Sequence, residues 1–176
     1  EILKEYKIIS LNQIGIEIDV EEDQETFKGN SIKKAEEIAK QLGGKMCLAD
    51  DSGIEIEYLN GFPGVHTKRW NQGTDKDRNL EILKKMDDVP KEKRKIKFIS
   101  AIAISDGEKT ITVEDYIEGY VSEQVRGDNG FGFDEIFELE NGKTLAEISQ
   151  EEKNKISARK KALQKIKNLV DFWEEK

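Results

Sequence analysis

The residues with the clearest chemical potential lie between positions 48 and 70. A short apolar segment leads into four polar or flexible residues, Asp50, Asp51, Ser52 and Gly53. Adjacent carboxylates at the end of a strand suit a hard cation such as Mg²⁺, which prefers oxygen ligands and keeps waters and substrate phosphates. Gly53 would let the backbone turn sharply, and Ser52 adds a hydroxyl at the same edge. A plain polar turn between two strands explains this segment equally well.

Two charged segments precede these carboxylates. Glu21, Glu22, Asp23 and Glu25 crowd one loop, which is typical of a solvated edge, although one member could reach a cation. The sequence does not select that member. Lys33 and Lys34 follow near the start of an expected helix, where a lysine beside free backbone N–H groups can hold a phosphate. A solvated role is favoured for Lys33, whereas the periodicity leaves Lys34 open.

Aromatic and glycine residues alternate over positions 129–134. Glycine lets a ligand lie against the backbone, and an aromatic ring such as Phe131 can stack on a nucleobase. The carboxylate of Asp134 could accept hydrogen bonds from base N–H groups. A tight turn whose phenylalanines fill the core is the commoner use of such a segment.

Lys153 and Arg159 bracket the expected start of the last helix, where an anion would also meet backbone donors. Charges this dense more often form a solvated helix face. His66 is the sole histidine and Cys47 the sole cysteine, which excludes histidine triads, multi-histidine metal sites and an intrachain disulfide.

The composition narrows the class of protein. A chain of 176 residues with 38% charged and 36% hydrophobic residues fits one soluble domain, or two small lobes sharing a core. Its net charge of -8 argues against binding to nucleic acid or to an anionic membrane. We find no signal peptide and no apolar run of roughly 18 residues, and the cysteine usage fits a reducing cytoplasm.

The elements that must position these residues follow from hydrophobic periodicity. It predicts helices over 30–42, 74–86 and 157–173, with a helical tail over 1–5. Capping boxes are expected at Thr74 with Asp77 and at Ser149 with Glu152. The buried stripe of the last helix should contain Ala162, Leu163, Ile166, Leu169, Val170 and Trp173.

Strands are expected over 6–10, 14–18, 46–49, 54–56, 96–105, 110–121 and 136–137. Segment 54–56 should pair with 46–49 as a hairpin, and Asp106-Gly107 should turn the long central hairpin. Interspersed strands and helices indicate an α/β class with a central mixed sheet flanked by helices. The long hairpin could carry a second lobe, with a cleft between the two lobes.

Four of these segments, in this order, resemble the inosine triphosphate pyrophosphatase family. The matches are Thr26-Phe27-x-x-Asn30-x-x-x-Lys34-Ala35, Ala49-Asp50-Asp51-Ser52-Gly53 with Gly61-x-Pro63-Gly64, Gly130-Phe131-Gly132-Phe133-Asp134-x-Ile136-Phe137, and Gly142-Lys143-Thr144-x-Ala146-Glu147 leading to Glu151-Glu152-Lys153-Asn154 and Ser157-x-Arg159. Each match is weak alone, but the ordered set spans most of the chain and is highly specific.

The resemblance implies Mg²⁺-dependent cleavage of inosine, deoxyinosine and xanthosine triphosphates between the α- and β-phosphates. The products would be the nucleoside monophosphate and pyrophosphate. It also implies an elongated two-lobed α/β fold, a substrate site in the interlobe cleft, and a homodimer. A purine nucleoside triphosphate would be the partner, with no nucleic acid or membrane involved.

The resemblance also implies roles for individual residues. Asp51 matches the general base and a metal ligand, and Glu22 falls at the position of the metal-binding glutamate. Lys34 and Lys153 match triphosphate-binding lysines. The predicted base pocket and the rest of the substrate-binding set comprise Phe131, Asp134, Arg159, Ser52, Gly132, Phe133 and Ala158. We further expect Asp50 to lie behind the metal and keep Asp51 ionised.

Two departures from the family pattern matter. The family opens with a strand and a Thr/Ser-Gly-Asn-x-x-Lys loop, so we expect residues 1–176 to form a single domain that lacks both. Ala158 stands where the family has a histidine that helps to recognise the 6-oxo purine. Two alternatives therefore stay open: a nucleotide-binding relative without turnover, and a pyrophosphatase of altered base preference.

Overall fold

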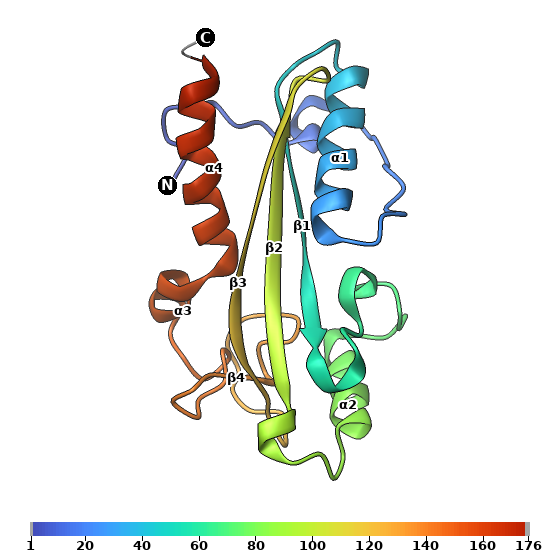
Figure 1. The fold of residues 1–176 in the computed structure, drawn as a ribbon, viewed down its shortest axis with the longest axis vertical. Coiled ribbons are helices and arrows are strands. Elements are labelled where there is room, and N and C mark those ends of the chain that lie inside the picture. The colour runs from blue at the N-terminus through green and yellow to red at the C-terminus, as the bar shows by residue number, and fades with distance from the viewer. Residues whose placement is uncertain (1, 175–176) are drawn as a thin grey trace. The chain divides into compact units, whose positions relative to one another are not determined.

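The computed structural model describes residues 2–174 of the chain, and the side chains of residues 2–170. The helices and strands, in chain order, are α1 (Phe27–Gln41), β1 (Cys47–Ile56), α2 (Asp75–Lys85), β2 (Lys95–Ser105), β3 (Thr110–Val121), β4 (Phe137–Glu138), α3 (Gln150–Ile156) and α4 (Ala158–Glu174) (Figure 1). The α/β class predicted from the sequence is confirmed.

The chain forms two compact units. The first comprises Glu1–Asp51, Ser100–Asp115 and Arg159–Lys176, and the second comprises Ser52–Ile99 and Tyr116–Ala158. Strands β1, β2 and β3 each contribute residues to both units. Each unit has its own helices and its own apolar clusters, so each is described separately.

The sheet has the order β1-β2-β3-β4 and is antiparallel, where the sequence suggested a mixed sheet. The expected hairpin joins β2 to β3. One Asp106 carboxylate oxygen accepts hydrogen bonds from the backbone N–H groups of Glu108 (3.0 Å) and Lys109 (2.8 Å). Gly107 has a φ of 93°, a conformation that glycine adopts without strain. A tight hairpin forces neighbouring strands to run in opposite directions, which explains the antiparallel pairing.

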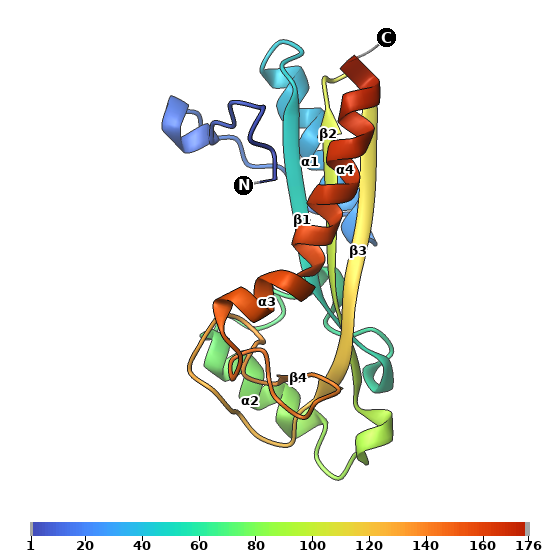
Figure 2. The same ribbon diagram turned by 90° about the vertical axis from the view of Figure 1, so that its left-hand side faces the viewer.

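In the first unit, α1 and α4 cover opposite faces of the strands (Figures 1 and 2). Alternate side chains of β2 point to the two faces. Ile102 and Ile104 pack in one cluster with Ala162, Ile166 and Val170 of α4. Ala103 packs instead with Ala35 of α1 and Ala49 of β1. Small alanines on one face and branched residues on the other thus decide which helix lies on which face.

The second unit contains the larger apolar cluster. Its buried members include residues of β1, α2, β2, β3 and β4, among them Ile54, Ile82, Ile96, Val121 and Phe137. Thr74 caps α2 in the predicted capping box, with its backbone N–H donating to Asp77 at 2.8 Å. The same arrangement of Ser149 and Glu152 opens α3. Both capping-box predictions are confirmed.

The first twenty residues differ from the prediction. The expected strands 6–10 and 14–18 are absent from the described structure, and Leu11–Ile14 forms a 3₁₀ helix. Ser10 and Gln13 cap this helix reciprocally, and Gly15 ends it with a φ of 67°. These local hydrogen bonds satisfy the backbone without a neighbouring strand. Residues 3–6 form turns and bends in place of the predicted helical tail, whose residue 1 lies outside the described residues.

Two further predictions need correction. Segments 46–49 and 54–56 are parts of one continuous strand, β1, and do not form a hairpin. Within the α4 stripe, Leu169 is 43% exposed, whereas Ala162, Ile166 and Val170 are buried. Trp173 lies outside the residues whose side chains are described.

Candidate active site

The two adjacent aspartates lie within β1, in an extended segment that continues through Gly53. Successive side chains of a strand point to opposite faces of the sheet. Asp51 therefore points to the face that carries α1, and Asp50 points to the face that carries α4. Their separate hydrogen-bond partners, described next, confirm this division.

Asp51 belongs to a group that we call the α1 cluster, defined as Glu22, Asn30, Lys34 and Asp51. The Lys34 Nζ atom lies 3.0 Å from an Asp51 carboxylate oxygen, 3.0 Å from a Glu22 carboxylate oxygen and 2.7 Å from the Asp50 carbonyl oxygen. The Asn30 amide donates to the second Asp51 oxygen at 3.2 Å. Asn30 and Lys34 are neighbours on α1, one helical turn apart, so one helix face supplies both donors.

The loop before α1 is held to this cluster by the same asparagine. Asn30 is fully buried, and its side-chain oxygen accepts the backbone N–H of Gln24 at 3.0 Å. Among the acidic residues of this loop, Glu22 lies 3.0 Å from the Lys34 ammonium. Lys33 contacts Asp23 at 2.9 Å, in keeping with the solvated role favoured for it.

Burial raises the pKa of Asp51 above the ordinary value of an aspartate, because the charged form is partly removed from water. The hydrogen bonds from Lys34 and Asn30 oppose this shift, and the nearby charge of Glu22 adds to it. A carboxylate with a raised pKa is a stronger base. The site therefore favours proton acceptance by Asp51 at a pH where it is ionised.

The donor set of the α1 cluster fits a hard divalent cation. Glu22 and Asp51 each place a carboxylate oxygen 3.0 Å from the same ammonium, so their oxygens converge on one cationic centre. In the described part of the chain, no three His, Cys, Asp or Glu side chains converge as a complete metal cage. Two carboxylates with the remaining positions left to water and phosphate are typical of Mg²⁺.

On the other face of β1, Asp50 links β2 to the first turn of α4. One carboxylate oxygen of Asp50 accepts from the Ser100 hydroxyl at 2.9 Å, and the other lies 2.9 Å from the Arg159 guanidinium. The expectation that the Asp50 side chain keeps Asp51 ionised is wrong, because it points to the opposite face. Asp50 reaches the α1 cluster through its backbone carbonyl instead.

The second unit contains the predicted aromatic segment, which we call the aromatic turn and define as residues 129–134. Phe131 is 68% exposed, so its ring is accessible for stacking. Phe133 is buried in the core cluster of this unit, the commoner use of such a phenylalanine. A Cβ atom on Gly130 would lie only 2.1 Å from an Asp134 carboxylate oxygen. Glycine at position 130 is therefore required for the turn to close over Asp134.

Contacts of Asp134 and of Lys153 in α3 stabilise this turn. The Asp134 carboxylate accepts the Phe131 backbone N–H at 2.8 Å and forms an ion pair with Lys153 of α3. The Lys153 ammonium also lies 4.6 Å from the centroid of the Phe131 ring, within the range of a cation–π interaction. An exposed aromatic face, a carboxylate and an ammonium are thus gathered at one place.

The two remaining predicted residues differ in burial and surroundings. Ser52, next to Asp51 in β1, is half-buried and belongs to the second unit, whereas Ala158 is buried.

The predicted base-pocket pair Asp134 and Arg159 belongs to two different units. Lys153, predicted for the triphosphate, contacts Asp134 and Phe131, and Arg159 contacts Asp50.

Sequence reasoning missed two residues of α2 that contact the aromatic turn. Asp75 accepts the Gly132 backbone N–H at 2.9 Å, and the Asn79 amide donates to the Gly132 carbonyl at 3.0 Å. A signal was available for Asn79, which lies on the same helix face as Ile82 and Met86 at helical spacing. A polar residue within an apolar stripe indicates a buried partner.

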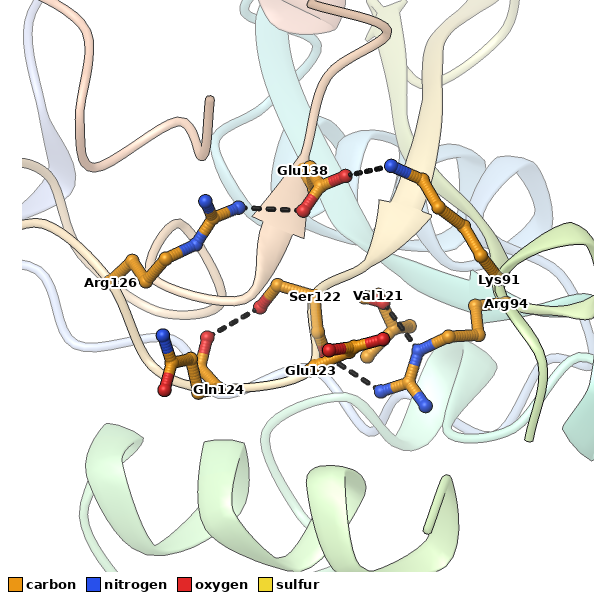
Figure 3. A pocket seen from close by; sticks show the side chains of 8 residues that line it. All are labelled: Lys91, Arg94, Val121, Ser122, Glu123, Gln124, Arg126 and Glu138. Atoms are coloured by element: carbon orange, nitrogen blue, oxygen red, sulfur yellow. Dashed lines mark hydrogen bonds and ion pairs between the residues drawn. The ribbon is translucent and has the colours of Figure 1, made fainter. Parts of the chain in front are cut away.

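The second unit also has a cavity of about 510 Å³, and none of the predicted site residues lines it (Figure 3). Its charged groups bind one another. Glu138 lies 2.6 Å from both Lys91 and Arg126. The buried Arg94 donates to the carbonyl oxygens of Met86 (2.6 Å), Val121 (2.7 Å) and Ser122 (2.6 Å). These contacts indicate that Arg94 stabilises the fold around the cavity.

Comparisons with known proteins identify the family of this chain. The chain matches the Ham1 family over residues 1–169. It is 44% identical to the dITP/XTP pyrophosphatase of Bacillus subtilis (94% of this chain, 85% of the relative) and 44% identical to that of Clostridium perfringens (96% and 88%).

Solved structures give the same result. The Ham1 protein of Staphylococcus aureus has a TM-score of 0.90 and 32% identity, with 99% of this chain and 91% of that chain covered. The HAM1 protein of Coxiella burnetii has a TM-score of 0.86 and 34% identity, with 97% and 89% covered. Among the described helices, none combines the length and apolar character that a bilayer crossing requires. The family match and the sequence identity to these relatives show that this chain belongs to the Ham1 family.

Proposed function

We propose that this chain hydrolyses non-standard purine nucleoside triphosphates, namely ITP, dITP and XTP, to the monophosphate and pyrophosphate. The observation that carries the proposal is the α1 cluster, in which a partly buried basic carboxylate, Asp51, is held by Lys34 and Asn30. The relatives named dITP/XTP pyrophosphatase support the choice of substrate.

Mg²⁺ is the proposed cofactor, and Glu22 and Asp51 would hold it. When bound, the ion would neutralise the negative charge of the phosphates, which is the main requirement of phosphoryl chemistry. Lys34 would bind phosphate oxygens through an ammonium that lies in place beside Asp51. Asp51 would accept a proton from water as water adds across the α–β anhydride bond, and pyrophosphate would leave with the bridging oxygen.

The aromatic turn is the proposed site for the nucleobase. The exposed ring of Phe131 offers a stacking surface, and Asp134 and Lys153 offer an acceptor and a donor beside it. Arg159 is proposed as a further donor for the base. The expectations of a single crevice between two lobes, of a homodimer, of one pyrophosphatase domain and of a cytoplasmic location all stay predictions.

Product analysis tests the proposal directly. The protein is incubated with ITP, dITP or XTP and Mg²⁺, and pyrophosphate and orthophosphate are measured separately. We expect one pyrophosphate and one monophosphate for each triphosphate consumed, with no turnover after the metal is removed by a chelator. Release of orthophosphate alone would refute the proposal, and tight nucleotide binding without turnover would favour the non-catalytic alternative.

The buried Ala158 supports a second candidate, a pyrophosphatase with an altered base preference. At this position the resemblance implies a histidine that contacts the 6-oxo group, whereas the Ala158 methyl group offers no hydrogen bond. A substrate panel with ITP, XTP, GTP, ATP and pyrimidine triphosphates separates the two candidates. Preference for a base without a 6-oxo group would establish the second candidate.

A further inference from the structure

Hydrogen bonds from two side chains of α2 meet at one residue of the aromatic turn, Gly132. Both backbone polar groups of Gly132 are bound by side chains of this helix, the N–H by Asp75 at 2.9 Å and the carbonyl by Asn79 at 3.0 Å. Asp75 and Asn79 are one helical turn apart and therefore lie on the same face of α2. Two bonds to one residue fix the direction of its backbone as well as its position.

Asn79 is a polar residue in apolar surroundings. The residue is fully buried on the apolar face of α2, together with Ile82 and Met86. Its amide nitrogen also contacts a Glu135 carboxylate oxygen at 3.0 Å, while its buried side-chain oxygen has no hydrogen-bond partner among the described residues. An unsatisfied buried acceptor is unfavourable, and an apolar residue would avoid it. Core packing alone therefore does not account for an asparagine here.

No atom of the described residues packs against Gly132 on the side where a side chain would lie. The residue has a φ of 64°, and a Cβ atom built on it would meet no atom within 4 Å. The neighbouring Phe131 ring is exposed, so core packing does not set its direction. The ring is oriented by its backbone, by the Asp134 and Lys153 contacts, and by the two bonds from α2 to the next residue.

The Asp75 carboxylate is ionised over a wide pH range. The Arg78 guanidinium, 2.6 Å away, lowers the pKa of Asp75, and the hydrogen bond from Gly132 lowers it further. Asp75 also lies in the first turn of α2, where a negative charge is favourable. This arrangement keeps a strong acceptor available to the Gly132 N–H.

We propose that Asn79 and Asp75 are positioning residues that fix the aromatic turn and thereby set the affinity of the enzyme for the nucleobase. This inference rests on the proposed function, since it deepens the role given to Phe131. The two residues act through the Gly132 backbone. Their loss should weaken binding of the base-bearing substrate and leave phosphate chemistry largely intact.

The test compares full-length variants of both residues with a matched control. Asn79→Leu replaces the amide with an apolar side chain of the same branching, and Asp75→Ala removes the acceptor, whereas Asp75→Asn keeps an acceptor oxygen and should rescue. Ile82→Val is the control, because it trims the same apolar cluster, which includes Phe133, and leaves both hydrogen bonds to Gly132 in place.

Three measurements are made on each variant. We expect Asn79→Leu and Asp75→Ala to raise the KM for ITP roughly tenfold while kcat changes less than about threefold. Competition by inorganic tripolyphosphate, which has no base, should be unchanged. Amide hydrogen exchange at Gly132 should become roughly tenfold faster in Asp75→Ala and return toward the wild-type rate in Asp75→Asn.

Two results would overturn the inference. One is unchanged exchange and KM in both Asn79→Leu and Asp75→Ala, and the other is an equal change of KM in Ile82→Val. If the wild-type protein releases no pyrophosphate from any triphosphate, the proposed function fails. Hydrogen exchange, with equilibrium binding of ITP measured in place of KM, then still decides whether α2 positions the turn.

Discussion

The α1 cluster and the aromatic turn each place an aspartate beside a lysine ammonium, but they differ in what surrounds this pair. Lys34 pairs with Asp51, and Lys153 of α3 pairs with Asp134 of the turn, with the side chains of both pairs largely buried. In the α1 cluster the side chains of Lys34 and Asp51 are only 17% and 12% exposed and are carried by a helix and a strand. In the aromatic turn, Phe131 is 68% exposed and is carried by a loop.

This difference suits the two functions proposed for these regions, bond cleavage and recognition of the base. Rigid elements hold groups within the small tolerance that bond cleavage requires, and burial makes their charges more effective. A loop is less precise but more easily adapted, which suits discrimination among bases of different shape. We expect substitutions in the α1 cluster to affect all triphosphates, and substitutions in the turn to depend on the base.

The largest effect is expected from Asp51→Asn. The amide cannot accept the proton from water, so kcat should fall about a thousandfold with every base. Steady-state pyrophosphate release measures this loss. Lys33→Ala is the matched control on the neighbouring α1 position, and it should keep most of the activity. Retention of more than a tenth of the wild-type kcat by Asp51→Asn would remove the role assigned to this residue.

Lys34→Met should have the next largest effect. Loss of a charge-assisted hydrogen bond to phosphate lowers kcat/KM by roughly 100-fold, to a similar extent for ITP and XTP. The variant also leaves Glu22 and Asp51 without their shared ammonium. Kinetics with both substrates check the prediction, and a loss confined to one base would contradict the assignment of Lys34 to the phosphates.

Phe131→Ala should have a smaller effect that depends on the base. Removal of one stacking ring costs about 1–3 kcal/mol of binding, so KM should rise roughly tenfold for purine substrates. Binding of inorganic tripolyphosphate should stay the same, since it has no base. Phe131→Tyr serves as the control because it keeps the aromatic face. An equal loss of tripolyphosphate binding would place Phe131 at the phosphates.

The smallest expected effect is a shift of the Asp51 pKa in the metal-free protein. The charge of Glu22 helps to raise the pKa of Asp51, so Glu22→Gln should lower that pKa. The base works only when ionised, so activity falls as the pH drops through the Asp51 pKa. Carboxyl carbon NMR on the metal-free protein measures the titration, with Glu25→Gln as the control from the same acidic loop. An upward shift in Glu22→Gln would contradict the arrangement.

The same shift has a consequence for stability. Between the ordinary and the raised pKa of Asp51, the folded protein binds more protons than the unfolded chain. Its free energy of unfolding therefore falls as the pH rises through this window. Burial of the charged Asp51 opposes folding, as expected for a group arranged for chemistry.

Features encoded by neighbouring residues could be predicted from the sequence. The capping boxes of α2 and α3 and the hairpin between β2 and β3 depend on residues only a few positions apart. The continuous strand β1 could not be recognised, because Asp-Asp-Ser-Gly is locally typical of a turn. In the extended strand, the two aspartates bind partners that are distant in sequence. Lys34 binds Asp51, and Arg159 binds Asp50.

The candidate site, like the fold, could be predicted only in part. The resemblance selected Asp51, Lys34 and Glu22, and the structure brings these three side chains together. It could not show that Arg159 pairs with Asp50, nor that α2 binds the aromatic turn. Those contacts join segments whose approach depends on the tertiary fold, so no local pattern records them.

The alternation of Asp50 and Asp51 along β1 makes the alignment of this strand part of the chemistry. Deletion of one residue before Asp50 would turn the Asp51 side chain to the face of α4. Ser52 would then occupy the position that Asp51 holds beside Lys34, even if the sheet still formed. Errors of strand alignment during folding should therefore produce a protein that is folded but inactive.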